Sequence, residues 1–280
     1  MLCHHWQHDV TAPALTMTSR SPSPLPDMLC WSPLDGPHRL LDHLALRDAD
    51  QVPAAMLVLA GVTPGAGVPD EALGDNRALA EASLHAASAA GIRRVLVASS
   101  SAVYGVDPRG AAFAETAQAR PFSAYGKAKL EMEIACQPAR ERGLEVCALR
   151  IGNVAGADAL LGPLTGQSAV GAEPLAIDAF ADGMGPLRSY IGVATMARVI
   201  AALVRYPAPL PKVLNLAAPN PVRMVALAKA AGWPVRRVTA PETARQSITL
   251  DCSLLNGLCP MSSTDSLPET MVQQWKATWP

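Results

Sequence analysis

The chain has 280 residues, a formal net charge of −1 and an apolar fraction of 50%. This composition excludes a wholly disordered chain, which would be rich in charge and poor in apolar residues, and it suits one large α/β domain with an added lobe. The balanced charge argues against a protein that binds nucleic acid through a general excess of positive charge. The longest near-apolar run, residues 52–62, is about half of what a bilayer needs, and Met1 begins no secretory signal. We therefore expect a cytoplasmic protein without membrane contact.

The cysteine and histidine spacing indicates neither a disulfide framework nor a metal site. None of the six cysteines forms a C-x-x-C pair, so we expect inert thiols in a reducing compartment. His4, His5 and His8 have no partner at metal-ligand spacing beyond Cys3, and we expect no bound metal. A Ser-His-Asp hydrolase is disfavoured, because the chain has no G-x-S-x-G motif and no histidine after its serine-rich segment.

Three strands are expected in the first sixty residues. Residues 14–18 and 28–32 are short apolar stretches followed by turn-forming Ser/Pro and Pro-Leu-Asp-Gly sequences. Residues 54–60 form a continuous apolar run that Gly61 ends, which is typical of a strand buried on both faces.

Strands and helices then alternate as in a parallel sheet with helices on both faces. The expected elements are a helix at 76–90 with Asn76 as its N-cap, a strand at 94–99, a helix at 122–142 that Pro138 interrupts, and a strand at 144–151. Beyond residue 156 the alternation weakens, leaving helices near 193–205 and 222–231. The pattern predicts an α/β fold: a Rossmann-like, doubly wound parallel sheet with a small C-terminal lobe.

Two segments carry residues suited to acid/base chemistry. Tyr125 and Lys129 stand at positions i and i+4 of an expected helix and so lie on one face. An ammonium beside a phenol stabilises phenolate and favours acid/base work by the tyrosine. Ser99, Ser100 and Ser101 directly follow an expected strand, and ligands of open parallel sheets bind at the carboxyl ends of strands.

These segments resemble the extended branch of the short-chain dehydrogenase/reductases, the NAD-dependent epimerase/dehydratase family, over about residues 28–235. The similar segments follow one another in family order: residues 56–61, Asn76, residues 95–105, Tyr125 with Lys129 and Glu133, residues 149–154, residues 188–193 and residues 213–216.

The resemblance implies a Rossmann-like region at 1–155 and a mainly substrate-binding lobe at 156–280. It implies catalytic roles for Ser100, Tyr125 and Lys129, with Ser99 and Ser101 as less favoured serines. The cofactor residues that it implies are Arg20, Asp35, Ala60, Gly61, Asn76, Ser99, Tyr125 and Lys129. The substrate residues that it implies are Ser100, Asn153 and Arg188, whose guanidinium suits a diphosphate.

The implied function is that of an NAD(P)-dependent epimerase or oxidoreductase acting on a secondary alcohol or ketone, with a nucleotide sugar as a candidate substrate. The alternative is a catalytically inactive cofactor-binding or scaffold protein of the same fold. The implied partner is a small molecule, and a homodimer is left open. Arg20 follows the expected second strand where an NAD-preferring fold has an acid, which slightly favours NADP over NAD.

Three features depart from the family pattern. The chain has no G-x-x-G-x-x-G turn, and residues 1–10 look like the tail of a first helix, so we expect in-frame upstream sequence to supply a strand and that turn. Ala194 and Thr195 stand where the family has an acidic pair. No Asp-Glu pair follows Ser100, which removes the acid/base set expected of sugar-nucleotide dehydratases.

Overall fold

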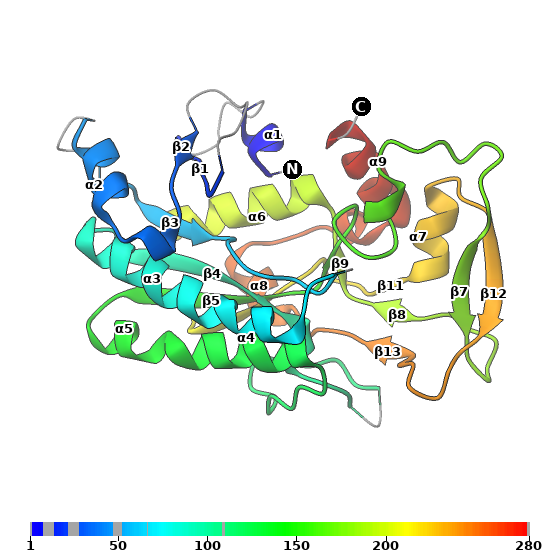
Figure 1. Cartoon of the computed structure of the whole chain (residues 1–280). Helices are drawn as coiled ribbons and strands as arrows, with labels where there is room; N and C mark the ends of the chain where they lie inside the picture. Colours follow the sequence, from blue (N-terminus) through cyan, green and yellow to red (C-terminus); the bar gives the residue numbers. More distant parts are fainter. Residues whose placement is uncertain are drawn as a thin grey trace.

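A four-stranded parallel sheet forms the centre of the molecule, in the order β10-β5-β4-β3 (Figure 1). The computed structural model describes residues 2–7, 14–21, 28–46, 52–65, 67–107 and 110–278. The strands are β3 (Ala55–Val58), β4 (Arg94–Ser100), β5 (Glu145–Ile151) and β10 (Val213–Leu216). The sheet confirms the predicted parallel α/β architecture.

Helices cover both faces of this sheet (Figure 1). On one face lie α3 (Asp75–Ala89), α4 (Ala124–Ala135) and α5 (Gln137–Glu141); on the other lies α6 (Val193–Arg205). Side chains alternate along a strand, so Val95 and Val97 join the cluster with α3 and α4, whereas Leu96 and Leu149 join the cluster with α6. Burial on both faces explains why the strands read as continuous apolar runs.

The helix ends differ from the sequence prediction at two places. The helix expected at 122–142 is interrupted at Cys136, and Pro138 lies in the first turn of α5, where its missing N–H costs nothing. Asn76 is not an N-cap, because α3 begins at Asp75 after the 3₁₀ turn η2 (Asp70–Gly74). The Asn76 side chain is instead buried and bonds to two loop segments.

The N-terminal elements form a separate small sheet. Strands β1 (Thr18–Ser19) and β2 (Leu29–Cys30) pair in parallel, so the strand expected at 14–18 is shorter and begins later than predicted. The turn η1 (Pro33–Asp35) and helix α2 (His38–Ala45) follow. Helix α1 (Leu2–Gln7) packs on α6, where the Trp6 indole donates to the Ala197 carbonyl at 3.1 Å. Residues 1 and 8–10, also expected to be helical, lie outside the described residues.

A smaller lobe lies at the far side of the sheet from α2 (Figure 1). Its strands pair as β7 (Leu175–Ala179) with β12 (Val235–Thr239), β6 (Asn153–Val154) with β9 (Tyr190–Ile191), and β8 (Leu187–Arg188) with both β11 (Val222–Arg223) and β13 (Ser247–Ile248). The remaining elements are η3 (Ser101–Val103), η4 (Gly162–Leu164), α7 (Met224–Ala230), α8 (Ser253–Leu258), η5 (Ser263–Ser266) and α9 (Pro268–Thr278).

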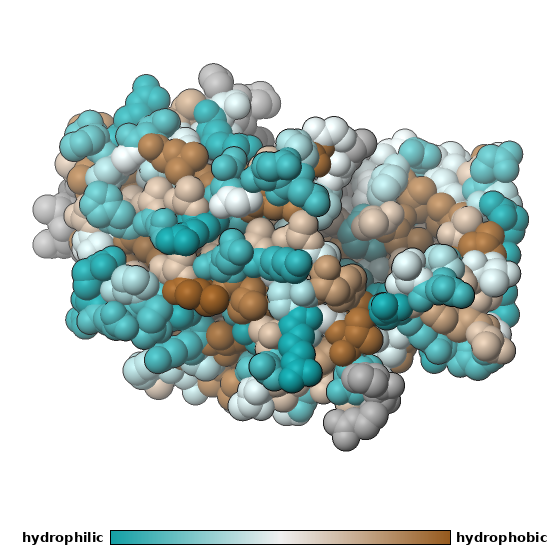
Figure 2. Space-filling model, turned by 60° about the horizontal axis from the view of Figure 1, so that its bottom comes forward, coloured by the Kyte–Doolittle hydropathy of each residue, from teal (hydrophilic) through white to brown (hydrophobic). Residues whose placement is uncertain are grey.

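The central sheet with its helices and the small lobe are not separated at a single residue of the chain. Strand β10 and helix α6 lie beyond residue 155 and still belong to the central sheet layer. The two-domain division at that residue therefore stays a prediction. Figure 2 shows the main body and the small lobe as two masses, with hydrophobic residues in separate patches among hydrophilic ones. No helix in the described part of the chain has the length and apolarity to cross a membrane.

Candidate active site

The three predicted catalytic residues meet at the carboxyl end of β4. Ser100 is the last residue of that strand, and Tyr125 lies in the first turn of α4. Ser123 caps this helix by accepting a hydrogen bond from the Gly126 amide at 3.0 Å. A Cβ on Gly126 would lie 2.4 Å from the Ala102 carbonyl oxygen, so glycine lets the start of α4 approach the turn after β4. This approach brings Tyr125 within hydrogen-bonding reach of the Ser100 side chain.

Lys129 lies one helical turn after Tyr125 and is buried, with 4% of its surface exposed. Its ammonium donates to the Ala98 carbonyl at 2.9 Å and lies 5.8 Å from the centroid of the Tyr125 ring. Burial lowers the pKa of Lys129 to about 8, against the opposing effect of the Glu133 carboxylate. The amine therefore changes charge near neutral to mildly alkaline pH.

The Tyr125 phenol is not acidified in this structure. Burial raises the pKa of Tyr125, and the hydrogen bond with Ser100 acts in the opposite direction without outweighing it. Desolvation penalises the phenolate more than Ser100 stabilises it, and the stabilisation of phenolate by the Lys129 ammonium stays a prediction.

Gly61, Asn76 and Lys129 converge at the end of β3. A Cβ on Gly61 would lie 2.7 Å from the Asn76 Oδ1 and 3.3 Å from the Lys129 Nζ. The Asn76 amide accepts from the Val62 amide at 3.2 Å and donates to the Val62 and Leu73 carbonyls at 2.9 and 2.8 Å. Asn76 therefore fixes the loop after β3, while the predicted neighbour Ala60 is exposed beside it.

This corner fits the nicotinamide-ribose half of a dinucleotide. An ammonium has three N–H donors. Among the described residues, Lys129 directs two of them to the Ala98 carbonyl and, at 4.0 Å, to the Met132 thioether. A ribose hydroxyl would satisfy the remaining capacity. The described residues show no glycine-rich turn before β3, so the fit applies to this half of the cofactor alone.

The two predicted adenosine contacts lie on one edge of the small N-terminal sheet. Arg20 directly follows β1, and Asp35 ends the turn η1 after β2. The two strands are parallel, with Ser19 paired to Cys30. Arg20 and Asp35 therefore come after strand ends that lie on the same edge of the sheet. Both residues are exposed. The structure thus brings them to one side of the sheet, apart from the Tyr125 site.

Two predicted ligand contacts already have protein partners. The Ser99 hydroxyl donates to the Glu133 carboxylate at 2.5 Å in the core. The Arg188 guanidinium donates to the carbonyls of Leu187, Gln246 and Arg245 at 2.8, 3.0 and 2.7 Å. Neither side chain is therefore without a protein partner, because helix α4 supplies the acceptor for Ser99, and Leu187 with the segment before β13 supplies those for Arg188.

Asn153 lies in β6 at the edge of the small lobe. Asn153 is paired with Tyr190 of β9, whose phenol donates to the Asp158 carboxylate at 2.8 Å. Burial, with the Asp158 carboxylate adding to it, raises the pKa of Tyr190 well above its usual value. The phenol thus stays protonated and keeps its hydrogen bond to Asp158. Asn153 remains a predicted substrate contact.

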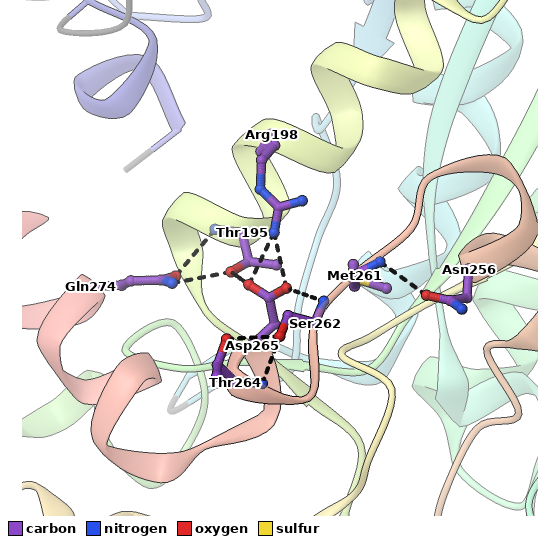
Figure 3. Close-up of polar contacts among 8 residues, drawn as sticks. All are labelled: Thr195, Arg198, Asn256, Met261, Ser262, Thr264, Asp265 and Gln274. Atoms are coloured by element: carbon purple, nitrogen blue, oxygen red, sulfur yellow. Dashed lines mark hydrogen bonds and ion pairs between the residues drawn. The ribbon is translucent and has the colours of Figure 1, made fainter.

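A polar cluster compensates for the missing acidic pair at Ala194 and Thr195 (Figure 3). The Thr195 amide, at the start of α6, donates to the Gln274 side chain at 3.1 Å, and the Thr195 hydroxyl donates to Asp265 at 2.9 Å. Asp265 also pairs with Arg198 at 2.9 Å. Gln274 of α9 thus caps a backbone amide of α6, and Asp265 of η5 bonds to two side chains of that helix. The cluster borders a cavity of about 330 Å³ that does not include the Tyr125 site.

Replacing Asp265 by Asn is expected to lower the free energy of unfolding by about 1–3 kcal/mol at neutral pH, because hydrogen bonds to a charged group are lost. Burial raises the pKa of Asp265, but the Ser262 amide, Thr195 and Arg198 outweigh it and hold the pKa below its usual value. The stabilisation is therefore present above about pH 4 and is lost as the pH falls through the lowered value.

Urea denaturation across this pH range measures the difference between the two proteins. Glu269→Gln is the control, since Glu269 is an exposed acid in the first turn of α9. Equal loss in both variants would contradict a specific role for Asp265.

A model of the NAD dependent epimerase/dehydratase family matches residues 6–217. UDP-glucose 4-epimerase from Brucella ovis in complex with NAD is 21% identical, with a TM-score of 0.74, over 90% of this chain and 85% of that chain. MoeE5 in complex with UDP-glucuronic acid and NAD is 23% identical, with a TM-score of 0.73, over 99% of this chain and 95% of that chain.

RMD from Pseudomonas aeruginosa complexed with NADPH is 18% identical, with a TM-score of 0.71, over 99% of this chain and 96% of that chain. No curated protein matches the sequence. The structural likenesses show a shared Rossmann-like fold, and the family model covers more than half of the residues. The chain therefore belongs to the NAD dependent epimerase/dehydratase family and is an NAD(P)-using enzyme of that kind.

Proposed function

We propose that this enzyme oxidises and reduces a secondary alcohol of a nucleotide sugar, as an epimerase or an oxidoreductase. The observation that carries the proposal is the meeting of Ser100, Tyr125 and Lys129 at the carboxyl end of β4. A protein that only binds a cofactor has no need of an acid/base group beside a buried amine. The nucleotide sugar is supported by two structures of similar fold: MoeE5 in complex with UDP-glucuronic acid, and a UDP-glucose 4-epimerase.

Each catalytic residue has a distinct task in this proposal. Bound NAD(P) supplies the hydride acceptor and donor. The Ser100 hydroxyl holds the substrate oxygen, and Tyr125 takes the proton from the substrate hydroxyl during oxidation and returns it during reduction. Lys129 holds the ribose and, when protonated, stabilises the phenolate that forms on Tyr125. Substrate binding must therefore supply interactions that offset the burial of the phenol.

Two routes share this first oxidation. In an epimerase the keto sugar turns over and is reduced on its other face, so no cofactor is consumed. In a simple oxidoreductase the keto product leaves and the cofactor exchanges. We propose Asn153 as a substrate contact in both routes, whereas Arg188 would have to exchange carbonyl partners before it bound a phosphate. Elimination of water is not proposed, because Ser101 and Ala102 follow Ser100 where a dehydratase has its acids.

The deciding experiment incubates the enzyme with UDP-glucose or UDP-glucuronic acid and either cofactor. Epimer formation, followed by proton NMR with no net change in reduced cofactor, identifies an epimerase. Stoichiometric formation of reduced cofactor identifies an oxidoreductase. Cofactor binding without turnover of any nucleotide sugar supports the alternative of an inactive scaffold and contradicts the proposal.

We further propose that Arg20 favours the binding of NADP over that of NAD. A guanidinium at the end of the second strand pairs with a 2′-phosphate, whereas an acid there binds the free 2′-hydroxyl. If the pair forms away from water, Arg20→Ala should weaken NADP binding relative to NAD by about 10- to 100-fold, the equivalent of about 1.5–3 kcal/mol. Calorimetric dissociation constants for both cofactors give this ratio.

The matched control is Arg39→Ala. Arg39 is an exposed arginine whose guanidinium donates to the Cys30 carbonyl at 3.3 Å, at the end of β2, the strand paired with the one that Arg20 follows. We expect its loss to leave the ratio of the two dissociation constants unchanged. An unchanged ratio in Arg20→Ala would remove Arg20 from cofactor selection.

A further inference from the structure

A buried carboxylate lies on the catalytic helix one turn beyond Lys129. Glu133 is 6% exposed and accepts the Ser99 hydroxyl at 2.5 Å. It also accepts two bonds from the Arg150 guanidinium, at 2.7 Å from Nη2 and 3.0 Å from Nε. One side chain on α4 is thereby joined to strand β4 through Ser99 and to strand β5 through Arg150.

The contacts of Glu133 lie beside Ser100 along strands β4 and β5. Ser99 continues the row of Val95 and Val97 that faces α4. Ser99 is paired with Arg150 in the β4–β5 ladder, and it directly precedes Ser100. We infer that Glu133 is a positioning residue, which holds Tyr125 and Lys129 on α4 at a fixed place relative to Ser100 on β4. The inference deepens the proposed function and rests on it for the identity of the site.

Stability alone is a poor explanation for this ion pair. Burying two charges costs about as much as their attraction returns, and apolar replacements of a buried pair are often at least as stable. The Arg150 Nη1 has no hydrogen-bond partner among the described residues, which adds a further cost. The guanidinium lies 4.6 Å from the centroid of the Tyr104 ring, which offsets part of that cost. The Glu133 carboxylate instead fixes an orientation, because it accepts three charge-assisted hydrogen bonds, one from Ser99 and two from Arg150.

The carboxylate also acts on the charge of the neighbouring amine. Glu133 raises the pKa of Lys129 against the lowering caused by burial. Tyr125 on α4 and the uncharged Asn76 on α3 also lie near the Lys129 ammonium. Two cations contact Glu133: Arg150 on β5 bonds to its carboxylate, and Arg140 on α5 donates to its backbone carbonyl at 3.5 Å. The ionisable side chains of η2 and α3, at positions 70, 71, 75, 77, 81 and 85, are exposed, and η3 has none.

The sequence offers a matched control at the other end of the same two strands. Arg94 and Glu145 are paired in the β4–β5 ladder and form an ion pair of 2.9 Å. This pair joins the same strands without touching the Tyr125 site. Glu145→Gln therefore removes an ion pair between β4 and β5 and leaves the geometry at Ser100 unaltered.

The test compares Glu133→Gln with Glu145→Gln. We expect both variants to melt at a lower temperature than the natural chain. Only Glu133→Gln should shift the titration of the Lys129 ammonium, read by NMR of labelled lysine and assigned with Lys129→Met, to lower pH. Only Glu133→Gln should lose turnover beyond the control, by about tenfold or more, since small misplacements of catalytic groups are costly.

Two further variants keep the inference falsifiable. Ser99→Ala keeps the Glu133 charge and removes one of its bonds, so it should lose turnover without shifting the Lys129 titration. If Glu133→Gln does not fold, the double variant Glu133→Leu/Arg150→Met replaces the pair with apolar side chains and should fold with the same loss of turnover.

Equal turnover and equal Lys129 titration in Glu133→Gln and Glu145→Gln would overturn the inference. The Lys129 titration needs neither substrate nor cofactor. It therefore reports on Glu133 even if Tyr125→Phe has no effect on turnover and the proposed function fails.

Discussion

Replacing Tyr125 by Phe is expected to lower turnover about 10²-fold or more, because a positioned general acid/base contributes about 10²–10⁴-fold. The change removes one hydroxyl, whose ionisation the Ser100 side chain favours, and leaves the ring 5.8 Å from the Lys129 amine. Cofactor affinity should change little. Turnover is measured with the nucleotide sugar that the enzyme converts best, and cofactor affinity by calorimetry.

Tyr206→Phe is the matched control for this result. Tyr206 follows α6, at a distance in the sequence from every predicted site residue, and its backbone carbonyl accepts from Arg94. Its hydroxyl has no role in the proposal, so turnover should stay within about twofold of the natural enzyme. Turnover of Tyr125→Phe in that same range would mean that Tyr125 is not the acid/base group.

Replacing Lys129 by Met should lower turnover by about 10²-fold and move the pH optimum upward. The pKa of Lys129 is about 8, so its ammonium supports phenolate below pH 8, and that support is lost as the pH rises through this value. Turnover of the natural enzyme should therefore decline as the pH rises through about 8, and this decline should be absent from Lys129→Met. Without the cation, Tyr125 also ionises only at higher pH, and both effects shift the optimum in the same direction.

The profile of kcat/KM against pH measures this shift, since it reports groups of the free enzyme. Lys127→Met is the control, because Lys127 is an exposed lysine on the same helix two residues away. A pH profile of Lys129→Met that keeps the decline near pH 8 would assign that decline to another group. Cofactor affinity should fall in Lys129→Met and stay constant in Lys127→Met.

Local sequence patterns were enough to predict the central layers of this protein. Continuous apolar runs at residues 54–60, 94–99 and 144–151 predicted strands buried on both faces, because a strand covered on one face alternates instead. The predicted helix at 193–205 has the bounds that the structure gives to α6. Strands of two residues, such as those in the small lobe, left no comparable pattern, since they are set by pairing between distant segments.

The candidate site, too, was predictable from the sequence only where local patterns fix it. The spacing of Tyr125 and Lys129 placed both residues on one helical face, because helical geometry repeats every 3.6 residues. The serine run after β4 placed Ser100 at the ligand-binding edge of a parallel sheet. The sequence could not show that Ser99 bonds to Glu133, although the alternation of Val95, Val97 and Ser99 was a signal that pointed Ser99 toward the helix.

By itself, the sequence determined the alternation of strands and helices from residue 54 to 151, the strand end that carries Ser100 and the helix face that carries Tyr125 with Lys129. Those features depend on residues near each other in the chain. The tertiary structure decided that Asn76 locks a loop, that three carbonyls hold Arg188 and that Gln274 caps α6. Each of these depends on which donors and acceptors distant segments bring together, and buried polar groups take whichever partner folding places within reach.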